Sequence, residues 1–210
     1  PNINKCYADF RSDTENFYYA LGAIKNVGFE AISNIVEERK KNGEFKSINN
    51  FIERVNPKNL NKLQLEGLVK AGAFDSLANN RKSLHDSIPN LILKSKNIFE
   101  NKSINQINLF EGEEIIEEDL LKKIEDWKFE DRLSKEFEAV GFFISDHPLN
   151  QFRDSFEDYN IISYIDFNNN EIKEANIAAT LLKIQEKKTQ KGNSYAIVKL
   201  TDLGSVFELF

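Results

Sequence analysis

Between residues 29 and 92, apolar side chains recur every three or four positions, and glycine or proline interrupts the pattern at short intervals. One group contains Ile32, Ile35 and Val36 and ends at Asn42-Gly43, just after three basic residues. Apolar residues at this spacing predict an amphipathic helix, and cations followed by glycine are typical of a helix C-terminus. This segment is therefore predicted to fold as short helices separated by tight turns.

Three more helices are expected in the same segment. Ser47 is a predicted N-cap for a helix that closes before Asn56-Pro57, and a third helix spans roughly Leu60 to Ala71. Asn80 is a predicted cap for a fourth helix, which Pro89 must kink or restart. The apolar positions of these helices are Ile48, Phe51, Ile52, Val55, Leu65, Leu68, Val69, Leu84, Ile88, Leu91 and Ile92.

The pattern changes after this helical unit. The polar stretch Lys94–Ser103 is interpreted as a linker, and helical spacing returns at Leu133, Phe137 and Val140 before Gly141. From Asn176 the residues become rich in β-branched and apolar types, which predicts strands over 176–184, 194–201 and 206–210. The sequence therefore predicts an α+β protein, with a helical part followed by a small β-unit that looks cut short.

Composition limits the class of protein. The chain has 210 residues, of which 40% are hydrophobic and 30% charged, enough for one domain with a core or for two small ones. No apolar run approaches the ~20 residues that span a bilayer. With one cysteine and no signal-peptide pattern, no membrane association is expected, and cytoplasmic localisation is predicted.

Charge is distributed unevenly along the chain. Between Arg54 and Lys96 there are eight basic residues against three acidic ones, whereas between Asn101 and Asn160 there are seven basic residues against sixteen acidic ones. This asymmetry suggests a part that faces anions and a part that is kept away from them. Solvated helix faces are the equally weighted alternative.

Two turns have the composition of a phosphate-binding loop. They are Gly22–Gly28, which leads into the Ile32 helix, and Ala71–Leu77, between the third and fourth predicted helices. A glycine-bearing turn ahead of a helix lets backbone N–H groups point at an anion, so a pair of such turns can hold a duplex backbone without reading its sequence. Glycine between helices is also an ordinary C-cap, and either turn taken alone is weak evidence.

A third feature is the pentapeptide Gln106–Phe110. Leu109 and Phe110 are adjacent in a polar stretch, and their spacing fits neither a helix nor a strand. Two exposed apolar side chains require cover, either from a pocket on the same domain or from a groove on another protein.

These segments together resemble one protein family. Tyr18–Gly28 (YYALGAIKNVG), Leu60–Lys62 with Leu68–Asp75 (LVKAGAFD), and Gly141–Leu149 (GFFISDHPL) are similar to signatures of the alpha subunit of bacterial DNA polymerase III. They occur in the family's order and cover nearly the whole chain. The resemblance implies tandem helix-hairpin-helix motifs at 1–100, a clamp-motif loop and connecting helices at 101–174, and the start of a β OB-fold at 175–210.

The resemblance also implies binding residues. Lys25, Asn26, Val27 and Gly28 correspond to the first hairpin, where Asn26 replaces a frequent glycine and tolerates the left-handed conformation. Gln106, Asn108, Leu109 and Phe110 resemble the sliding-clamp consensus, in which apolar anchors fill a pocket. The remaining predicted DNA contacts are Lys62, Lys70, Gly72 and Ala73 for duplex DNA and Lys187, Lys188 and Lys191, in the expected basic loop 187–193, for single-stranded DNA.

The expected partners are therefore double-stranded DNA, the sliding clamp, the other polymerase III holoenzyme subunits and single-stranded DNA. No nucleophile–base pair, His/Cys metal cluster or set of strand carboxylates is recognisable in the sequence, so no cofactor or catalytic centre is expected in this segment. The resemblance implies magnesium for the parent polymerase, whose catalytic aspartates lie upstream. The alternatives are a stand-alone helix-hairpin-helix module of a repair factor and a structural connector that does not touch DNA.

Overall fold

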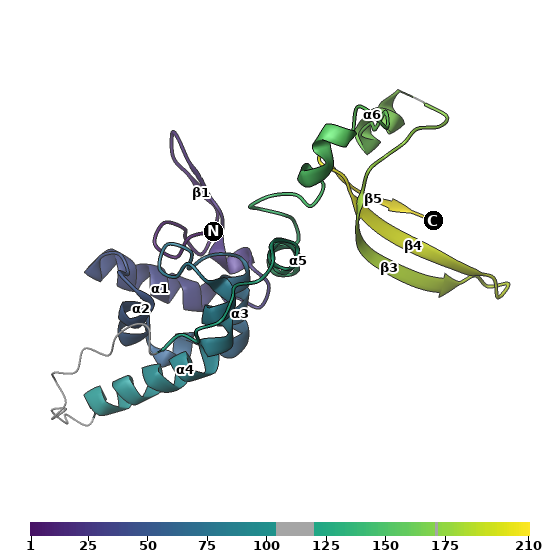
Figure 1. Cartoon of the computed structure of the whole chain (residues 1–210). Helices are drawn as coiled ribbons and strands as arrows, with labels where there is room; N and C mark the ends of the chain where they lie inside the picture. The colour runs from purple at the N-terminus through teal and green to yellow at the C-terminus, as the bar shows by residue number, and fades with distance from the viewer. Residues whose placement is uncertain (104–119, 171) are drawn as a thin grey trace. The chain divides into compact units, whose positions relative to one another are not determined.

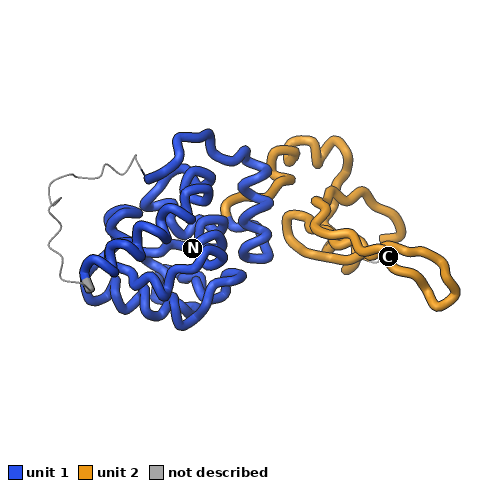
Figure 2. The backbone as a smooth tube through the Cα atoms, turned by 90° about the horizontal axis from the view of Figure 1, so that it is seen from below, with its two compact units in different colours: residues 1–144 blue, residues 145–210 orange. Residues whose placement is uncertain are grey.

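A computed structural model describes residues 1–103, 120–170 and 172–210, and the chain divides into two compact units, residues 1–144 and 145–210 (Figures 1 and 2). Each unit is described by itself. Unit 1 consists of β1 (Arg11–Ser12), β2 (Phe17–Tyr18), η1 (Leu21–Ala23), α1 (Phe29–Asn42), α2 (Ile48–Arg54), η2 (Pro57–Asn59), α3 (Lys62–Lys70), α4 (Arg81–Ser103) and α5 (Phe129–Val140). The predicted division into three parts, at 1–100, 101–174 and 175–210, stays a prediction.

The helix ends of unit 1 follow the sequence signals closely. The side chain of Ser47 accepts a hydrogen bond from the Asn50 N–H and caps α2, as predicted for a serine at this position. Gly43 and Gly141 have φ angles of 81° and 91° directly after α1 and α5. A residue with a side chain is strained at such angles, so glycine fixes where these two helices end.

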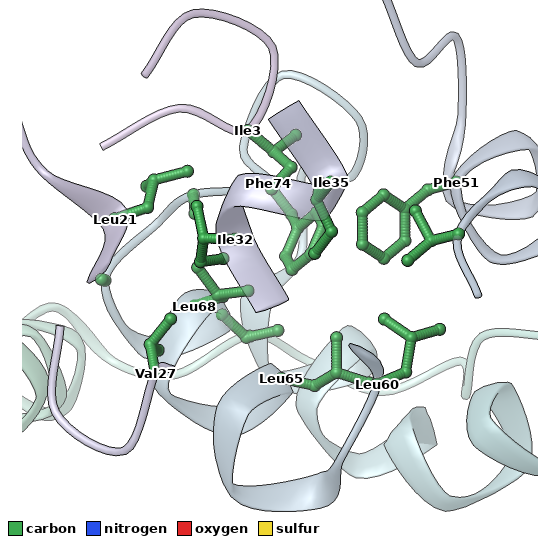
Figure 3. Close-up of a cluster of buried hydrophobic side chains, with 14 of the residues drawn as sticks. Ile3, Leu21, Val27, Ile32, Ile35, Phe51, Leu60, Leu65, Leu68 and Phe74 are labelled. Atoms are coloured by element: carbon green, nitrogen blue, oxygen red, sulfur yellow. The ribbon is translucent and has the colours of Figure 1, made fainter. Parts of the chain in front are cut away.

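The core of unit 1 is formed by side chains of α1, α2, α3 and α4 together with residues before α1, and Figure 3 shows part of it. Phe51 is 1% exposed and meets Phe45 and Phe74 edge to face, with ring centroids 5.0 Å apart in both pairs. Aromatic pairs in this arrangement add stability beyond the area that they bury. The apolar stripe predicted for α1 is confirmed, because Ile32 and Ile35 are fully buried.

One expectation for unit 1 is wrong. The stretch 94–103, interpreted as a linker, is the C-terminal part of α4, which runs unbroken past Pro89. Ser95 donates a hydrogen bond to the Ile52 carbonyl at 3.0 Å, and the Lys102 ammonium donates to the Glu53 carbonyl at 3.1 Å. These contacts with the C-terminal half of α2 stabilise a polar segment whose composition alone does not favour a helix.

Unit 2 consists of η4 (Asn150–Ser155), α6 (Tyr164–Asn169) and a three-stranded antiparallel sheet in the order β3 (Thr180–Lys188), β4 (Ser194–Thr201) and β5 (Val206–Leu209). Val198 pairs with Ile184 and with Leu209, so an apolar row crosses one face of the sheet. On this face Phe207 is 7% exposed and stacks on Tyr164 of α6, with ring centroids 4.0 Å apart. The predicted class is confirmed: a helical region is followed by a small antiparallel sheet.

The turn between β4 and β5 is held by Asp202, which is 6% exposed. Its carboxylate accepts hydrogen bonds from the N–H groups of Tyr164, Gly204 and Ser205. Burial would raise the pKa of Asp202, but these donors outweigh burial and the pKa is lowered. Asp202 thereby fastens the start of α6 to the end of the sheet.

The strand boundaries differ from the predicted ones. β3 begins at Thr180 instead of residue 176 and continues to Lys188, beyond the predicted end at Ile184. The basic loop is therefore shorter than expected. Lys187 and Lys188 lie within the strand, opposite Tyr195 and Ser194.

Candidate nucleic-acid interface

The first hairpin lies between η1 and α1 and places its apolar and polar side chains on opposite sides. Ile24 and Val27 are 2% and 7% exposed, and the Val27 N–H donates to the Ile24 carbonyl at 3.0 Å. Lys25, Asn26 and Gly28 are exposed. Asn26 has a φ of 65°, which confirms the left-handed conformation expected at this position. The turn is thus anchored from inside and presents a cation, an amide and a glycine to solvent.

Two helices hold this turn in place. The Lys25 N–H donates to the Ala139 carbonyl of α5 at 2.9 Å. On α3, a Cβ atom at Gly67 would lie 2.7 Å from the Lys25 carbonyl oxygen, so only glycine allows this close approach. Gly67 was not singled out from the sequence, although a glycine within a helical pattern is a signal for such a contact.

The N-terminus of α1 is open. Gly28 is the N-cap residue and has no side chain that can accept a hydrogen bond from the first turn. By contrast, Ser47, Asn61 and Ser163 cap α2, α3 and α6 with their side chains. The first N–H groups of a helix have no partner within the helix, and together with the helix dipole they attract an anion. Glu30 lies in the same turn and opposes this attraction.

The second hairpin, after α3, uses its backbone groups within the fold. Gly72 has a φ of 76°, and its N–H donates to Val69, while the Ala73 N–H donates to Leu68 at 2.9 Å. This pair of bonds is the Schellman arrangement that closes a helix C-terminus. The Ala73 carbonyl in turn accepts from the Ile3 N–H at 2.8 Å. Gly72 and Ala73 therefore contribute to the fold at this turn.

Arg81 fills the space in front of the second hairpin. Its guanidinium binds both carboxylate oxygens of Asp75, at 2.8 and 2.6 Å, and one oxygen of Glu136 at 2.8 Å. A Cβ at Gly72 would collide with the Arg81 guanidinium. Burial alone would lower the pKa of Arg81, but its bonds to Asp75 and Glu136 raise it. Arg81, counted among the anion-facing cations in the sequence, is 5% exposed and links α4 to α5.

The predicted lysines of α3 differ in their surroundings. Lys62 is largely exposed and lies 3.8 Å from Glu66. Lys70 has a side chain only 16% exposed and forms an ion pair with Glu138 of α5 at 2.9 Å. The hydrogen bond from Lys70 is the largest cause of the lowered pKa of Glu138. Lys70 therefore has a structural partner, whereas Lys25 and Lys62 present their charge to solvent.

In unit 2, the basic residues gather at the tip of the β3–β4 hairpin. Lys187, Lys188 and Lys191 are exposed, and Gly192 has a φ of 84° in the turn. The turn is closed by a hydrogen bond from the Thr189 N–H to the Asn193 carbonyl at 2.8 Å. The pentapeptide residues Gln106, Asn108, Leu109 and Phe110 lie outside the described residues.

The buried position of Glu136 was not predicted from the sequence. It is 1% exposed on α5, where the helical pattern had suggested only Leu133, Phe137 and Val140. A carboxylate in a helix is normally expected to face water. The sequence signal for its burial was its position in the helical repeat, three residues after Leu133 and three before Ala139. Leu133, Glu136 and Ala139 form the buried face that α5 presents within unit 1.

Comparison with known proteins identifies this arrangement. A family model described as a helix-hairpin-helix motif matches residues 1–84, which contain both hairpins. DNA polymerase III subunit alpha of Caulobacter vibrioides is 31% identical over 216 residues, covering 100% of this chain. The proteins of the same name from Rickettsia conorii and Campylobacter jejuni are 37% and 33% identical and cover 91% and 99% of it. The chain is homologous to one segment of the DNA polymerase III alpha subunit.

The chain matches only a small part of these relatives. The chain spans 18%, 16% and 18% of the length of these three relatives. In the described parts of the chain, no helix is long and apolar enough to cross a membrane. In those parts, no group of three or more His, Cys, Asp or Glu side chains is placed to hold a metal ion.

Proposed function

We propose that this segment holds duplex DNA for a DNA polymerase III alpha subunit and connects that subunit to its sliding clamp. The parent protein would extend DNA from deoxynucleoside triphosphates with magnesium bound at residues outside this segment. Support for duplex binding comes from the helix-hairpin-helix match over residues 1–84 and from the homology that extends through both units. The cytoplasm is the proposed location.

One observation carries the proposal: the exposed turn Lys25–Gly28 leads directly into the N-terminus of α1, where no side chain caps the helix. A phosphate oxygen at this position can accept hydrogen bonds from the first N–H groups of α1. Lys25 adds a neutralising charge, and Gly28 leaves room because nothing lies within 4 Å of a Cβ built there. Contacts of this kind are made with the backbone and do not depend on base sequence.

The second hairpin supports the first in this proposal. Gly72 and Ala73 hold the end of α3, and Arg81 joins that end to α5. Since α3 and α5 both contact the Lys25 turn, the second hairpin stabilises the surface on which phosphate would bind. Lys62 and Lys70 would add charge to this surface, with Lys70 weakened by its bond to Glu138.

The other predicted contacts complete the proposed function. Lys187, Lys188 and Lys191 would meet single-stranded DNA at the tip of the β3–β4 hairpin, where three exposed cations lie close together in sequence. Gln106, Asn108, Leu109 and Phe110 would bind the sliding clamp. Further holoenzyme subunits would bind elsewhere on the parent protein.

Binding of a labelled duplex, followed by fluorescence anisotropy over a salt series, tests the proposal. We expect weak binding that is independent of base sequence, and Lys25→Gln should reduce the slope of log affinity against log salt by about 0.9. Lys41→Gln is the matched control, because Lys41 is an exposed lysine near the other end of α1. Glu30→Gln should strengthen binding. Equal salt slopes for wild type and Lys25→Gln would refute the proposal that this surface binds duplex DNA.

A stand-alone repair module is the alternative. It would explain the hairpins of unit 1, but the polymerase relatives match up to 100% of the chain and so include unit 2. Binding to the cognate sliding clamp would favour the polymerase segment, since the hairpins of a repair module account for DNA binding alone.

A further inference from the structure

Phe29 is a large aromatic side chain that remains exposed beside the first hairpin. It is the first residue of α1, directly after Gly28, and is 58% exposed. The apolar residues of the adjacent turn that pack in the core are Ile24 and Val27, and both are buried. The exposed ring of Phe29 is therefore not required to complete the core.

One edge of this ring packs against the fold. A Cβ built on Gly22 would lie 3.3 Å from Cδ2 of the Phe29 ring and 3.4 Å from its Cα atom. The ring rests against the η1 backbone, at a position where any residue other than glycine would crowd it. The Phe29 carbonyl also accepts a hydrogen bond from the Ser33 hydroxyl at 3.0 Å. A ring that already packs on one edge loses less conformational freedom than a fully free side chain when a partner covers it.

The surroundings of Phe29 favour duplex DNA as that partner. Its backbone N–H belongs to the open first turn of α1, and Lys25 presents a cation from the adjoining turn. All of these residues lie within the region that matches the helix-hairpin-helix model. Beside each phosphate of a duplex lies the apolar edge of a deoxyribose, so a ring next to a bound phosphate is placed to contact that edge.

We infer that Phe29 makes an apolar contact with the deoxyribose surface of duplex DNA, next to the phosphate held by the first hairpin. The inference rests on the proposed function of this hairpin and adds a contact of a different kind. A phosphate contact releases counterions and weakens as salt increases, whereas an apolar contact releases none. The contribution of Phe29 should therefore be independent of salt.

The salt series described for Lys25 provides the test, with the full 210-residue chain and a labelled duplex of arbitrary sequence. Phe29→Ala should weaken binding about tenfold at every salt concentration, the effect expected from burying roughly half of a phenylalanine side chain. Its log–log salt slope should equal that of wild type. Phe29→Leu, which keeps an apolar side chain, should retain most of the affinity.

Phe129→Ala is the matched control. Phe129 is also the first residue of a helix, α5, and is 47% exposed, so its truncation has the same chemistry at another site. We expect Phe129→Ala to bind DNA with wild-type affinity. The melting temperatures of both alanine variants should stay close to that of wild type. Wild-type affinity for Phe29→Ala, an equal loss for Phe129→Ala, or a reduced slope for Phe29→Ala would each overturn the inference. If Lys25→Gln and Phe29→Ala both leave binding unchanged, the proposed function fails as well.

Discussion

The ion pair between Arg81 and Glu136 is the connection through which α4 holds α5. Both side chains are nearly inaccessible, at 6% and 1% exposure, and lie 2.8 Å apart. Ions this far from water are stable only when their charges and hydrogen bonds are matched, and Asp75 supplies the second carboxylate that the guanidinium needs. At the level of single residues, a buried charge network thus fixes the helix against which the first hairpin rests.

Glu136→Gln should therefore destabilise unit 1. Removing one partner of a buried pair leaves the other charge uncompensated, and we expect a loss of about 3 kcal/mol, near the low end for such changes because Asp75 still binds Arg81. Urea unfolding followed by the fluorescence of Trp127, the single tryptophan, measures the stability of unit 1.

Glu138→Gln is the control for this prediction. Glu138 lies two residues further along α5, is 54% exposed and pairs with Lys70, so its loss should cost less than about 1 kcal/mol. Equal costs for the two variants would show that the Arg81–Glu136 pair has no special role.

At the scale of elements, α4 shows what a sequence reveals about a helix and what it does not. Its start at Asn80 and its apolar stripe were predictable, because the cap and the spacing are local signals. Its continuation through 94–103 was not, because hydrogen bonds from Ser95 and Lys102 to α2 stabilise it. Tertiary contacts of this kind override weak local propensity.

The candidate site likewise has features that local sequence signals predict and features that depend on tertiary contacts. The Lys25–Gly28 turn was recognisable from its glycines and from the resemblance, and the left-handed Asn26 was anticipated. Gly67 and Glu136 were not singled out, since their roles depend on which elements α3 and α5 pack against. The basic tip of the β3–β4 hairpin was located, but its strand boundary was misplaced because Lys187 and Lys188 have little strand propensity.

Pro89 gives a prediction for α4. Proline within a helix lacks the N–H for one hydrogen bond and costs about 3 kcal/mol relative to alanine, while it also restricts the unfolded chain by up to about 1 kcal/mol. Pro89 is exposed, so Pro89→Ala removes little packing and should stabilise unit 1 by about 2 kcal/mol. Thermal unfolding of the variant checks this.

Asn90→Ala is the matched control, because Asn90 is the next residue of α4 and is also exposed. It changes only helix propensity and should stabilise by less than about 0.7 kcal/mol. A lower melting temperature for Pro89→Ala than for wild type would mean that Pro89 is needed for the packing of α4 against α2 and α3.

For the whole molecule, the proposed function combines two kinds of attachment. Unit 1 would bind the DNA backbone, and the pentapeptide at 106–110, with its two adjacent apolar residues, would bind the clamp. Phosphate contacts of the first kind are weak, sensitive to salt and indifferent to sequence. A separate tether raises the effective concentration of a weak binder at its target. A clamp-bound polymerase could then stay on DNA although each phosphate contact is easily broken.

The last prediction concerns the proposed attachment to the clamp. Changing both Leu109 and Phe110 to alanine should nearly abolish binding to the cognate sliding clamp, because each buried anchor residue contributes ~2 kcal/mol or more. The melting temperature should stay almost constant, since a surface substitution usually changes stability by less than ~0.5 kcal/mol. Gln106→Ala should weaken clamp binding less, through lost hydrogen bonds. Clamp titration and thermal unfolding of the same variants give both quantities.

Ile115 and Ile116 supply the control, as a second adjacent apolar pair a few residues along the same segment. Their double alanine variant should bind the clamp like wild type if recognition depends on the pentapeptide itself. The opposite model makes Leu109 and Phe110 internal anchors of this chain, and their truncation would then cost a few kcal/mol of stability each. A large drop in melting temperature with unchanged clamp affinity would decide for that model and against a tether.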